Sequence, residues 1–73
     1  MISYEPLFRT MKEKGISSYQ LGKLGFSMTN YHAMRRGKYV STHTIDTLCD
    51  ILNCNVADVM EFRRIPENND ENQ

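Results

Sequence analysis

Helix-breaking residues recur at regular intervals in this chain, and they constrain its fold more than any other feature. Gly15, Gly25 and Gly37 divide the first half. Asn53-Cys54-Asn55 divides the second half. The intervals between these breaks are short, and apolar residues recur in them with helical spacing. No segment alternates apolar and polar residues as a strand does, and no internal repeat is present. The sequence therefore predicts an all-α fold made of short helices.

Two segments carry apolar residues at positions i, i+3, i+4 and i+7, the pattern of an amphipathic helix. One is expected to run from about Tyr4 to Lys14, and the other to begin at Ser41 or Thr42. A further short helix is expected to begin at Asn55, because asparagine is a good N-cap. The apolar residues of the two clear faces are Tyr4, Leu7, Phe8 and Met11, and Ile45, Leu48, Cys49 and Leu52.

Two more helices are expected between the glycines. Ser17 and Gln20 have the spacing of a capping box, which predicts a helix of barely two turns ending at Gly25. Ser27 is the expected N-cap of the next helix, which ends at Gly37. Two helices joined by a tight turn that contains glycine form a helix-turn-helix. The five expected helices together form a compact bundle, with the helix-turn-helix at helices 2 and 3.

The residues around this turn indicate what is buried. Phe26 and Tyr31 are placed to pack the crossing of the two helices, and Tyr31 and Met34 give the third helix one buried edge. Gly22 is a poor helix former, so we interpret it as the site of a close approach by another backbone. The opposite edge of the third helix is left for solvent or a partner.

Charge is distributed unevenly along the chain. Residues 1–40 contain seven basic and two acidic residues, a net charge of +5. Residues 41–73 contain two basic and seven acidic residues, a net charge of −5. A basic half favours an anionic partner, although charges on short helices also segregate by chance. No acidic residue occurs from Ser27 to Val40, so the expected third helix carries nothing that repels phosphate.

Length and composition argue against several classes of protein. A chain of 73 residues forms one domain, expected over residues 1–65, with little room for a substrate cleft. We therefore expect no enzymatic activity, no cofactor and no small-molecule substrate. The acidic and polar tail 66–73 contains no apolar residue and is expected to be disordered. With neither a secretory signal nor an apolar run of about 20 residues, a cytoplasmic location and no membrane contact are expected.

The cysteines and histidines do not form a metal-binding pattern. Cys49 and Cys54 are not a CxxC pair, and no second Cys or His pair lies at zinc-ligand spacing. Cys49 belongs to an apolar helical face and is expected in the core. His32 and His43 are expected to be surface or cap residues. A redox or metal sensor that acts through the two cysteines is kept as an alternative.

The free edge of the third helix has the chemistry of a DNA reader. An α-helix fits the major groove, where Thr and Asn offer hydrogen bonds and Met and Ala offer apolar contact to a thymine methyl group. A helical module that binds only other proteins is the alternative interpretation. The base-reading candidates are Ser27, Met28, Thr29, Asn30 and Ala33.

The stretch from Ser17 to Val59 resembles the Cro/cI-type (XRE) helix-turn-helix family, whose fold is that of the lambda-repressor-like DNA-binding domains. It is most similar to a small stand-alone subgroup of bacteria and phages with the signature Thr-x-x-x-Leu-Cys-x-x-Leu-x-Cys-x-x-x-Asp-Val-x-Glu-aromatic. The matching positions are Leu21, Gly25-Phe26-Ser27, Tyr31, Met34, Gly37-Lys38 and the run from Ser41 to Phe62, which ends in Asp58-Val59-Met60-Glu61-Phe62.

This resemblance implies a sequence-specific DNA-binding regulator of transcription, a repressor, that binds double-stranded DNA. It implies base reading by the first turns of the third helix. The residues expected to contact the DNA backbone are Ser18, Tyr19, Gln20, Arg35, Arg36, Lys38 and Tyr39. Two roles are open for Val56, Val59, Met60 and Phe62: a homodimer contact, or closure of the core. The alternative function is an antitoxin-like interaction module without specific DNA binding.

The sequence departs from the family pattern in two ways. Leu21 and Gly25 stand closer together than is usual, so the second helix is expected to be one residue short. The net charge is zero, whereas strong DNA binders usually carry excess Lys and Arg. One subunit alone is therefore expected to bind weakly, and two subunits bound one helical turn (~34 Å) apart fit the usual arrangement.

Overall fold

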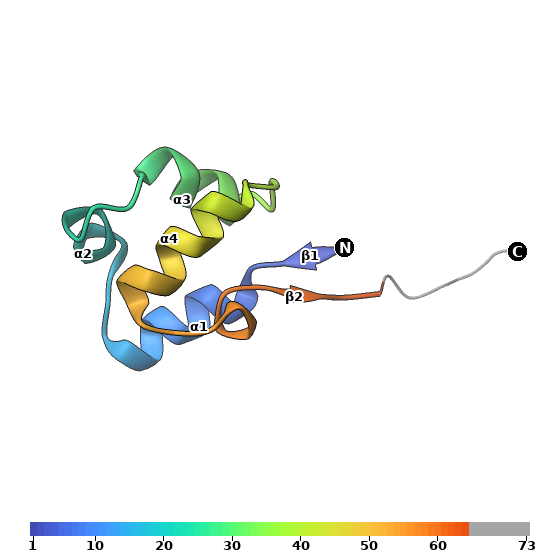
Figure 1. Cartoon of the computed structure of the whole chain (residues 1–73), viewed down its shortest axis with the longest axis horizontal. Helices are drawn as coiled ribbons and strands as arrows, with labels where there is room; N and C mark the ends of the chain where they lie inside the picture. Colours follow the sequence, from blue (N-terminus) through green and yellow to red (C-terminus); the bar gives the residue numbers. More distant parts are fainter. Residues whose placement is uncertain (65–73) are drawn as a thin grey trace, which may run out of the picture.

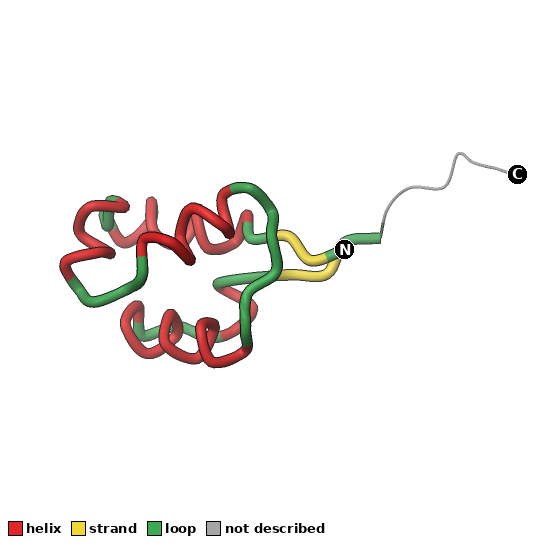
Figure 2. Tube along the Cα trace, turned by 90° about the horizontal axis from the view of Figure 1, so that it is seen from above, coloured by secondary structure: helices red, strands yellow, loops and turns green. Residues whose placement is uncertain are grey.

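The computed structural model describes residues 1–64, which form four α-helices, one 3-10 turn and a two-stranded antiparallel sheet (Figure 1). Residues 65–73, which include the tail expected to be disordered, lie outside the described residues. The helices cluster together, and the paired strands extend from one end of the cluster (Figure 2). The elements are β1 (Ile2–Ser3), α1 (Glu5–Lys14), α2 (Ser18–Lys23), α3 (Met28–Arg35), α4 (Thr42–Leu52), the 3-10 turn η1 (Val56–Asp58) and β2 (Glu61–Phe62).

Serines start α2, α3 and α4: Ser17 and Ser27, which were expected as N-caps, and Ser41, one of the two expected starts of its helix. The side chain of Ser17 accepts the backbone N–H of Gln20, and the Gln20 side chain accepts the backbone N–H of Ser17 at 2.9 Å. This confirms the predicted capping box. Ser27 and Ser41 cap α3 and α4 in the same way, each accepting the N–H three residues later. These bonds satisfy backbone donors that a helix start otherwise leaves unpaired.

The apolar faces predicted for the first and fourth helices form the core. Phe8 and Cys49 are half-buried against this core, at the margin of the two faces. The turn residue Phe26 is buried, as expected. The buried hydrophobic side chains are Tyr4, Leu7, Met11, Leu21, Phe26, Tyr31, Met34, Ile45, Leu48, Leu52 and Val59.

The prediction of a fifth helix is wrong. The chain after Asn55 makes only the three-residue turn η1, and then runs extended. The backbone N–H of Asn55 donates to a carboxylate oxygen of Asp58 at 3.0 Å, which closes the turn on itself. The β-branched Val56 and Val59 lose side-chain freedom in a helix, so a longer helix has little local support here. A bundle of five helices is therefore replaced by four helices and a turn.

The expectation that the chain contains no strand is also wrong. Ile2 pairs with Phe62 and Ser3 pairs with Glu61 in an antiparallel ribbon. Each strand has only two residues, too few for an alternating pattern to appear in the sequence. The ribbon joins the two ends of the described chain, because Arg63 N–H also donates to the Met1 carbonyl at 2.8 Å.

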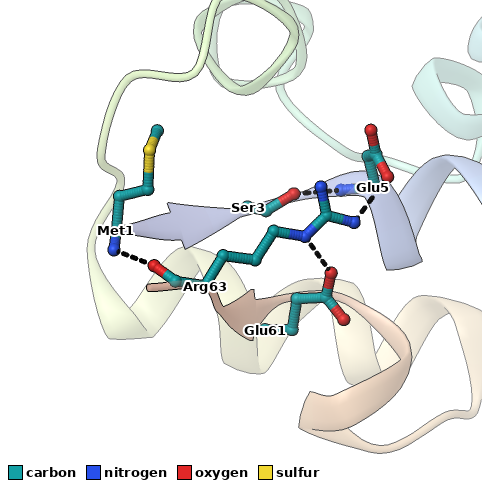
Figure 3. Close-up of polar contacts among 5 residues, drawn as sticks. All are labelled: Met1, Ser3, Glu5, Glu61 and Arg63. Atoms are coloured by element: carbon teal, nitrogen blue, oxygen red, sulfur yellow. Dashed lines mark hydrogen bonds and ion pairs between the residues drawn. The ribbon is translucent and has the colours of Figure 1, made fainter. Parts of the chain in front are cut away.

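Arg63 holds this ribbon to the start of α1 (Figure 3). Its guanidinium donates to Glu5 and to Glu61, each at 2.6 Å, and its carbonyl accepts the Met1 ammonium group. The hydrogen bonds to Glu5 and then to Glu61 raise the pKa of Arg63 above its usual value. All three side chains are exposed, so solvent and salt weaken these pairs.

Replacement of Ser17 by alanine is expected to lower the free energy of unfolding by about 1 kcal/mol, because α2 loses its N-cap. Chemical unfolding followed by circular dichroism measures the change. Ser18→Ala is the matched control, since Ser18 is exposed and no hydrogen bond of its side chain is found among residues 1–64. Equal losses for the two variants would contradict the cap assignment.

Candidate nucleic-acid interface

The turn between α2 and α3 sets the crossing of these two helices. Gly25 adopts a φ of 106°, in the region that side-chain-bearing residues rarely occupy. Its N–H donates to Gly22, and the N–H of Phe26 donates to the Leu21 carbonyl at 3.2 Å. Phe26 then enters the core, while Leu24 stays exposed. A tight glycine turn between two helices, as predicted, is therefore present at the helix-turn-helix position.

The inner edge of α3 is anchored by Tyr31 and Met34, both buried as predicted. The ring of Tyr31 lies edge-on to that of Phe8 from α1, with centroids 6.1 Å apart. The Arg35 guanidinium lies over the Phe8 ring, 5.2 Å from its centroid. α3 is thus held along one side by α1 and the core.

The opposite edge of α3 is free. Thr29, Ala33 and Arg36 follow the spacing i, i+4 and i+7, so they share a face that points away from Tyr31 and Met34. Thr29 and Arg36 are exposed, and Ala33 is partly buried. This edge offers a hydroxyl, methyl groups and one guanidinium to a partner.

Two of the five base-reading candidates, Met28 and Asn30, have side chains that contact other helices. The side chain of Met28 lies over Gly22, where a Cβ atom would meet its atoms at 3.4–3.5 Å. Gly22 therefore accommodates a flexible side chain, and the expected close approach of another backbone is wrong. The Asn30 amide nitrogen donates to the Thr44 hydroxyl of α4 at 3.3 Å.

The other three base-reading candidates, Ser27, Thr29 and Ala33, differ in which side-chain groups are free to contact a partner. Ser27 is exposed, but its hydroxyl accepts the backbone N–H of Asn30 at 3.2 Å as the N-cap. Thr29 is exposed and Ala33 half-buried, and no side-chain hydrogen bond of Thr29 is found in the part of the chain that the structure describes. Thr29 is thus the candidate whose polar group is most available.

The residues expected to contact the DNA backbone fall into two groups. Ser18, Tyr19 and Gln20 lie at the start of α2, where Tyr19 is 72% exposed and carries Lys23 over its ring at 5.5 Å. A hollow of about 210 Å³ is lined by Ser18 and also by Arg35, so these two candidates lie on one side of the molecule.

The second group follows α3. Arg36, Lys38 and Tyr39 are exposed around Gly37, which has a φ of 75°, and Tyr39 is 74% exposed. The Lys38 N–H donates to the Ala33 carbonyl at 2.9 Å and so fixes the start of this loop against α3. The ion pairs found within residues 1–64 are both made by Arg63, which leaves these cations outside any of them.

Three further polar residues, which the sequence analysis does not count among the DNA-contact candidates, lie on or beside α3. His32 is exposed on α3. His43 and Thr47 of α4 line a hollow of about 180 Å³ together with Ser27 and Asn30. Their i, i+4 spacing places them on one polar face of the predicted fourth helix, and that spacing was the available signal.

Cys54 is poorly suited to act as a thiolate. Burial, followed by the neighbouring Cys49 and Asp58, raises the pKa of the Cys54 thiol. A raised thiol pKa disfavours both nucleophilic attack and metal binding. Within residues 1–64 no three His, Cys, Asp or Glu side chains are grouped so as to hold a metal ion.

Of the four residues that could form a dimer surface or close the core, one is buried in the core. Val59 is 0% exposed and belongs to the core, so it is not available to a partner. Val56 and Phe62 are exposed and Met60 is half-buried.

Among residues 1–64 no helix is long and apolar enough to cross a membrane.

Comparison with known protein families identifies the type of domain to which these helices belong. Residues 7–64 match the Cro/C1-type HTH DNA-binding domain, which covers most of the chain and all four helices apart from the first two residues of α1. Comparison with curated proteins and with solved structures gives no significant match. The matched range includes the capped α2, the glycine turn and the free edge of α3. The chain therefore belongs to the family of Cro/C1-type helix-turn-helix DNA-binding domains.

Proposed function

We propose that the protein is a sequence-specific transcriptional repressor of a bacterium or phage that acts in the cytoplasm. It inserts α3 into the major groove of double-stranded DNA and reads bases through its outer edge. The observation that carries this proposal is the free edge of α3, where Thr29, Ala33 and Arg36 form a row without any acidic neighbour from residue 27 to residue 40. Occupation of a promoter site by such a domain blocks access of other proteins to it.

Phosphate contacts are proposed on both sides of this edge. The start of α2 with Ser18 and Tyr19 approaches the backbone on one side, and Lys38 with Tyr39 approaches it on the other. Arg36 adds charge at the end of α3. Such contacts position the helix and supply most of the affinity, while the groove contacts supply the specificity.

Selection from randomised duplexes with the full 73-residue chain tests the function. An enriched site is expected, bound at least ~10³-fold more tightly than a scrambled duplex of equal length at the same salt concentration. Fluorescence anisotropy measures both affinities. Equal affinity for the two duplexes would overturn the proposal and would favour a module that binds proteins.

A protein contact is supported by one further observation. α4 and η1 border an apolar hollow of about 250 Å³ lined by Ile45, Cys49, Val56 and Met60, with Asp46 at its edge. We propose that this side, with Phe62, carries the homodimer contact, which would place two α3 helices in successive major grooves. Sedimentation at micromolar concentration distinguishes a dimer from a monomer.

A further inference from the structure

The outer edge of α3 presents fewer base-reading side chains than the sequence of the helix suggests. The residue best suited to base recognition is Asn30, because an asparagine amide can bond both N6 and N7 of adenine. The structure directs its amide nitrogen toward Thr44 of α4, at 3.3 Å. Thr44 is 8% exposed, so the nitrogen end of the amide is turned toward a nearly buried hydroxyl of α4. The paired presentation of nitrogen and oxygen that adenine needs is therefore lost.

The partner of Asn30 is itself fixed. The Thr44 hydroxyl lies 3.1 Å from the hydroxyl of Ser41, and the Thr44 N–H donates to the same Ser41 oxygen at 3.2 Å. Ser41 is the N-cap of α4, so the network joins Asn30 to the start of the next helix. Asn30 is thus placed to hold α3 at a set angle to α4 rather than to contact a base.

Met28 is withdrawn from the edge by a different contact. Its side chain lies against the backbone of Gly22 in α2 and against the core. Of the base-reading candidates within α3, Thr29 and Ala33 remain on the outer edge, one turn apart. Thr29 carries a methyl group beside its hydroxyl, and the side chain of Ala33 is a methyl group. Apolar contact of this kind distinguishes thymine, which carries a 5-methyl group in the major groove, from cytosine, which does not.

We propose that α3 recognises thymine through contacts of Thr29 and Ala33 with 5-methyl groups, while Asn30 is a positioning residue held by Thr44. This inference rests on the proposed function and specifies the bases that it reads. Each methyl contact is expected to change affinity about fourfold, the effect of burying one group of this size.

Replacement of thymine by uracil removes the methyl group and leaves base pairing intact, and therefore tests the proposal directly. In the selected duplex each thymine is replaced singly, and affinity is measured for the full chain. One or two replacements are expected to weaken binding by the wild-type protein about fourfold. Thr29→Ser keeps the hydroxyl but loses the methyl, and is expected to abolish one of these effects. Ala33→Gly is expected to abolish another.

The comparison of thymine with uracil within one variant cancels any loss of stability, so a weakened fold does not obscure the result. Asn30→Ala is expected to reduce the preference for thymine at both positions together, because α3 loses its fixed angle. Replacement of adenines by 7-deazaadenine tests whether Asn30 reads bases. We expect no 7-deazaadenine replacement to weaken binding by the wild type while leaving binding by Asn30→Ala unchanged.

The outcomes separate the inference from the function on which it rests. A selected site that is bound tightly but tolerates every uracil within twofold overturns thymine recognition and leaves DNA binding intact. A dependence on adenine N7 that disappears in Asn30→Ala overturns the positioning role. Failure to select any site overturns the proposed function and the inference with it.

Discussion

Replacement of Leu48 by alanine is expected to lower the free energy of unfolding by about 2–5 kcal/mol. Leu48 lies on the inner face of α4, is 0% exposed and is surrounded by the core. The substitution removes buried apolar surface and leaves a cavity. A domain of this size has a total stability at the lower end of about 5–15 kcal/mol, so the variant is expected to be largely unfolded near 37 °C.

Urea unfolding followed by circular dichroism measures this loss. Asp50→Ala is the matched control, because Asp50 belongs to the same helix and is exposed. Its stability is expected to change by no more than about 0.5 kcal/mol. If Leu48→Ala unfolded at the same urea concentration as the control, the assignment of α4 to the centre of the core would be wrong.

Simultaneous replacement of Arg36 and Lys38 by alanine is expected to weaken DNA binding about 60-fold near 0.1 M salt, irrespective of the DNA sequence. Each lost phosphate contact reduces the slope of log affinity against log salt by about 0.9. Two contacts therefore reduce its magnitude by about 1.8. Anisotropy titrations between about 0.05 and 0.3 M salt, roughly a sixfold range in concentration, provide the slope.

The control for this experiment removes the same charge elsewhere. Arg9 and Lys14 are exposed cations of α1, and Lys14 lies near Cys54, which follows the end of α4. Arg9→Ala combined with Lys14→Ala is expected to leave the salt slope unchanged. Equal slopes for the two double variants would show that net charge, rather than contact at the end of α3, determines the affinity.

The helical part of the fold could be predicted because its signals are local. Ser17 and Gln20 lie within one turn, and the apolar face of Ile45 to Leu52 repeats along one helix, so adjacent residues specify each element. The 3-10 turn was mistaken for a helix because Asn55 and Asp58 begin both kinds of structure in the same way. Only the later pairing of Phe62 with Ile2 determines where the turn stops.

The candidate interface was predictable only in part, for a related reason. The burial of Tyr31 and Met34 follows from their spacing on one helix, and the free edge follows from it in turn. The contacts of Asn30 with Thr44 and of Met28 with Gly22 join different elements, and no local pattern encodes them. They decide which side chains of α3 remain available, so the sequence identifies the edge but not its chemistry.

The ribbon of β1 and β2 has a consequence for the order in which the domain forms. It pairs residues about sixty positions apart through two residues on each strand, so closing this long loop gains few contacts. The α2–α3 unit, in contrast, is closed by hydrogen bonds between near neighbours. Amide protons of the ribbon therefore exchange with solvent first, through openings that leave the α2–α3 unit folded.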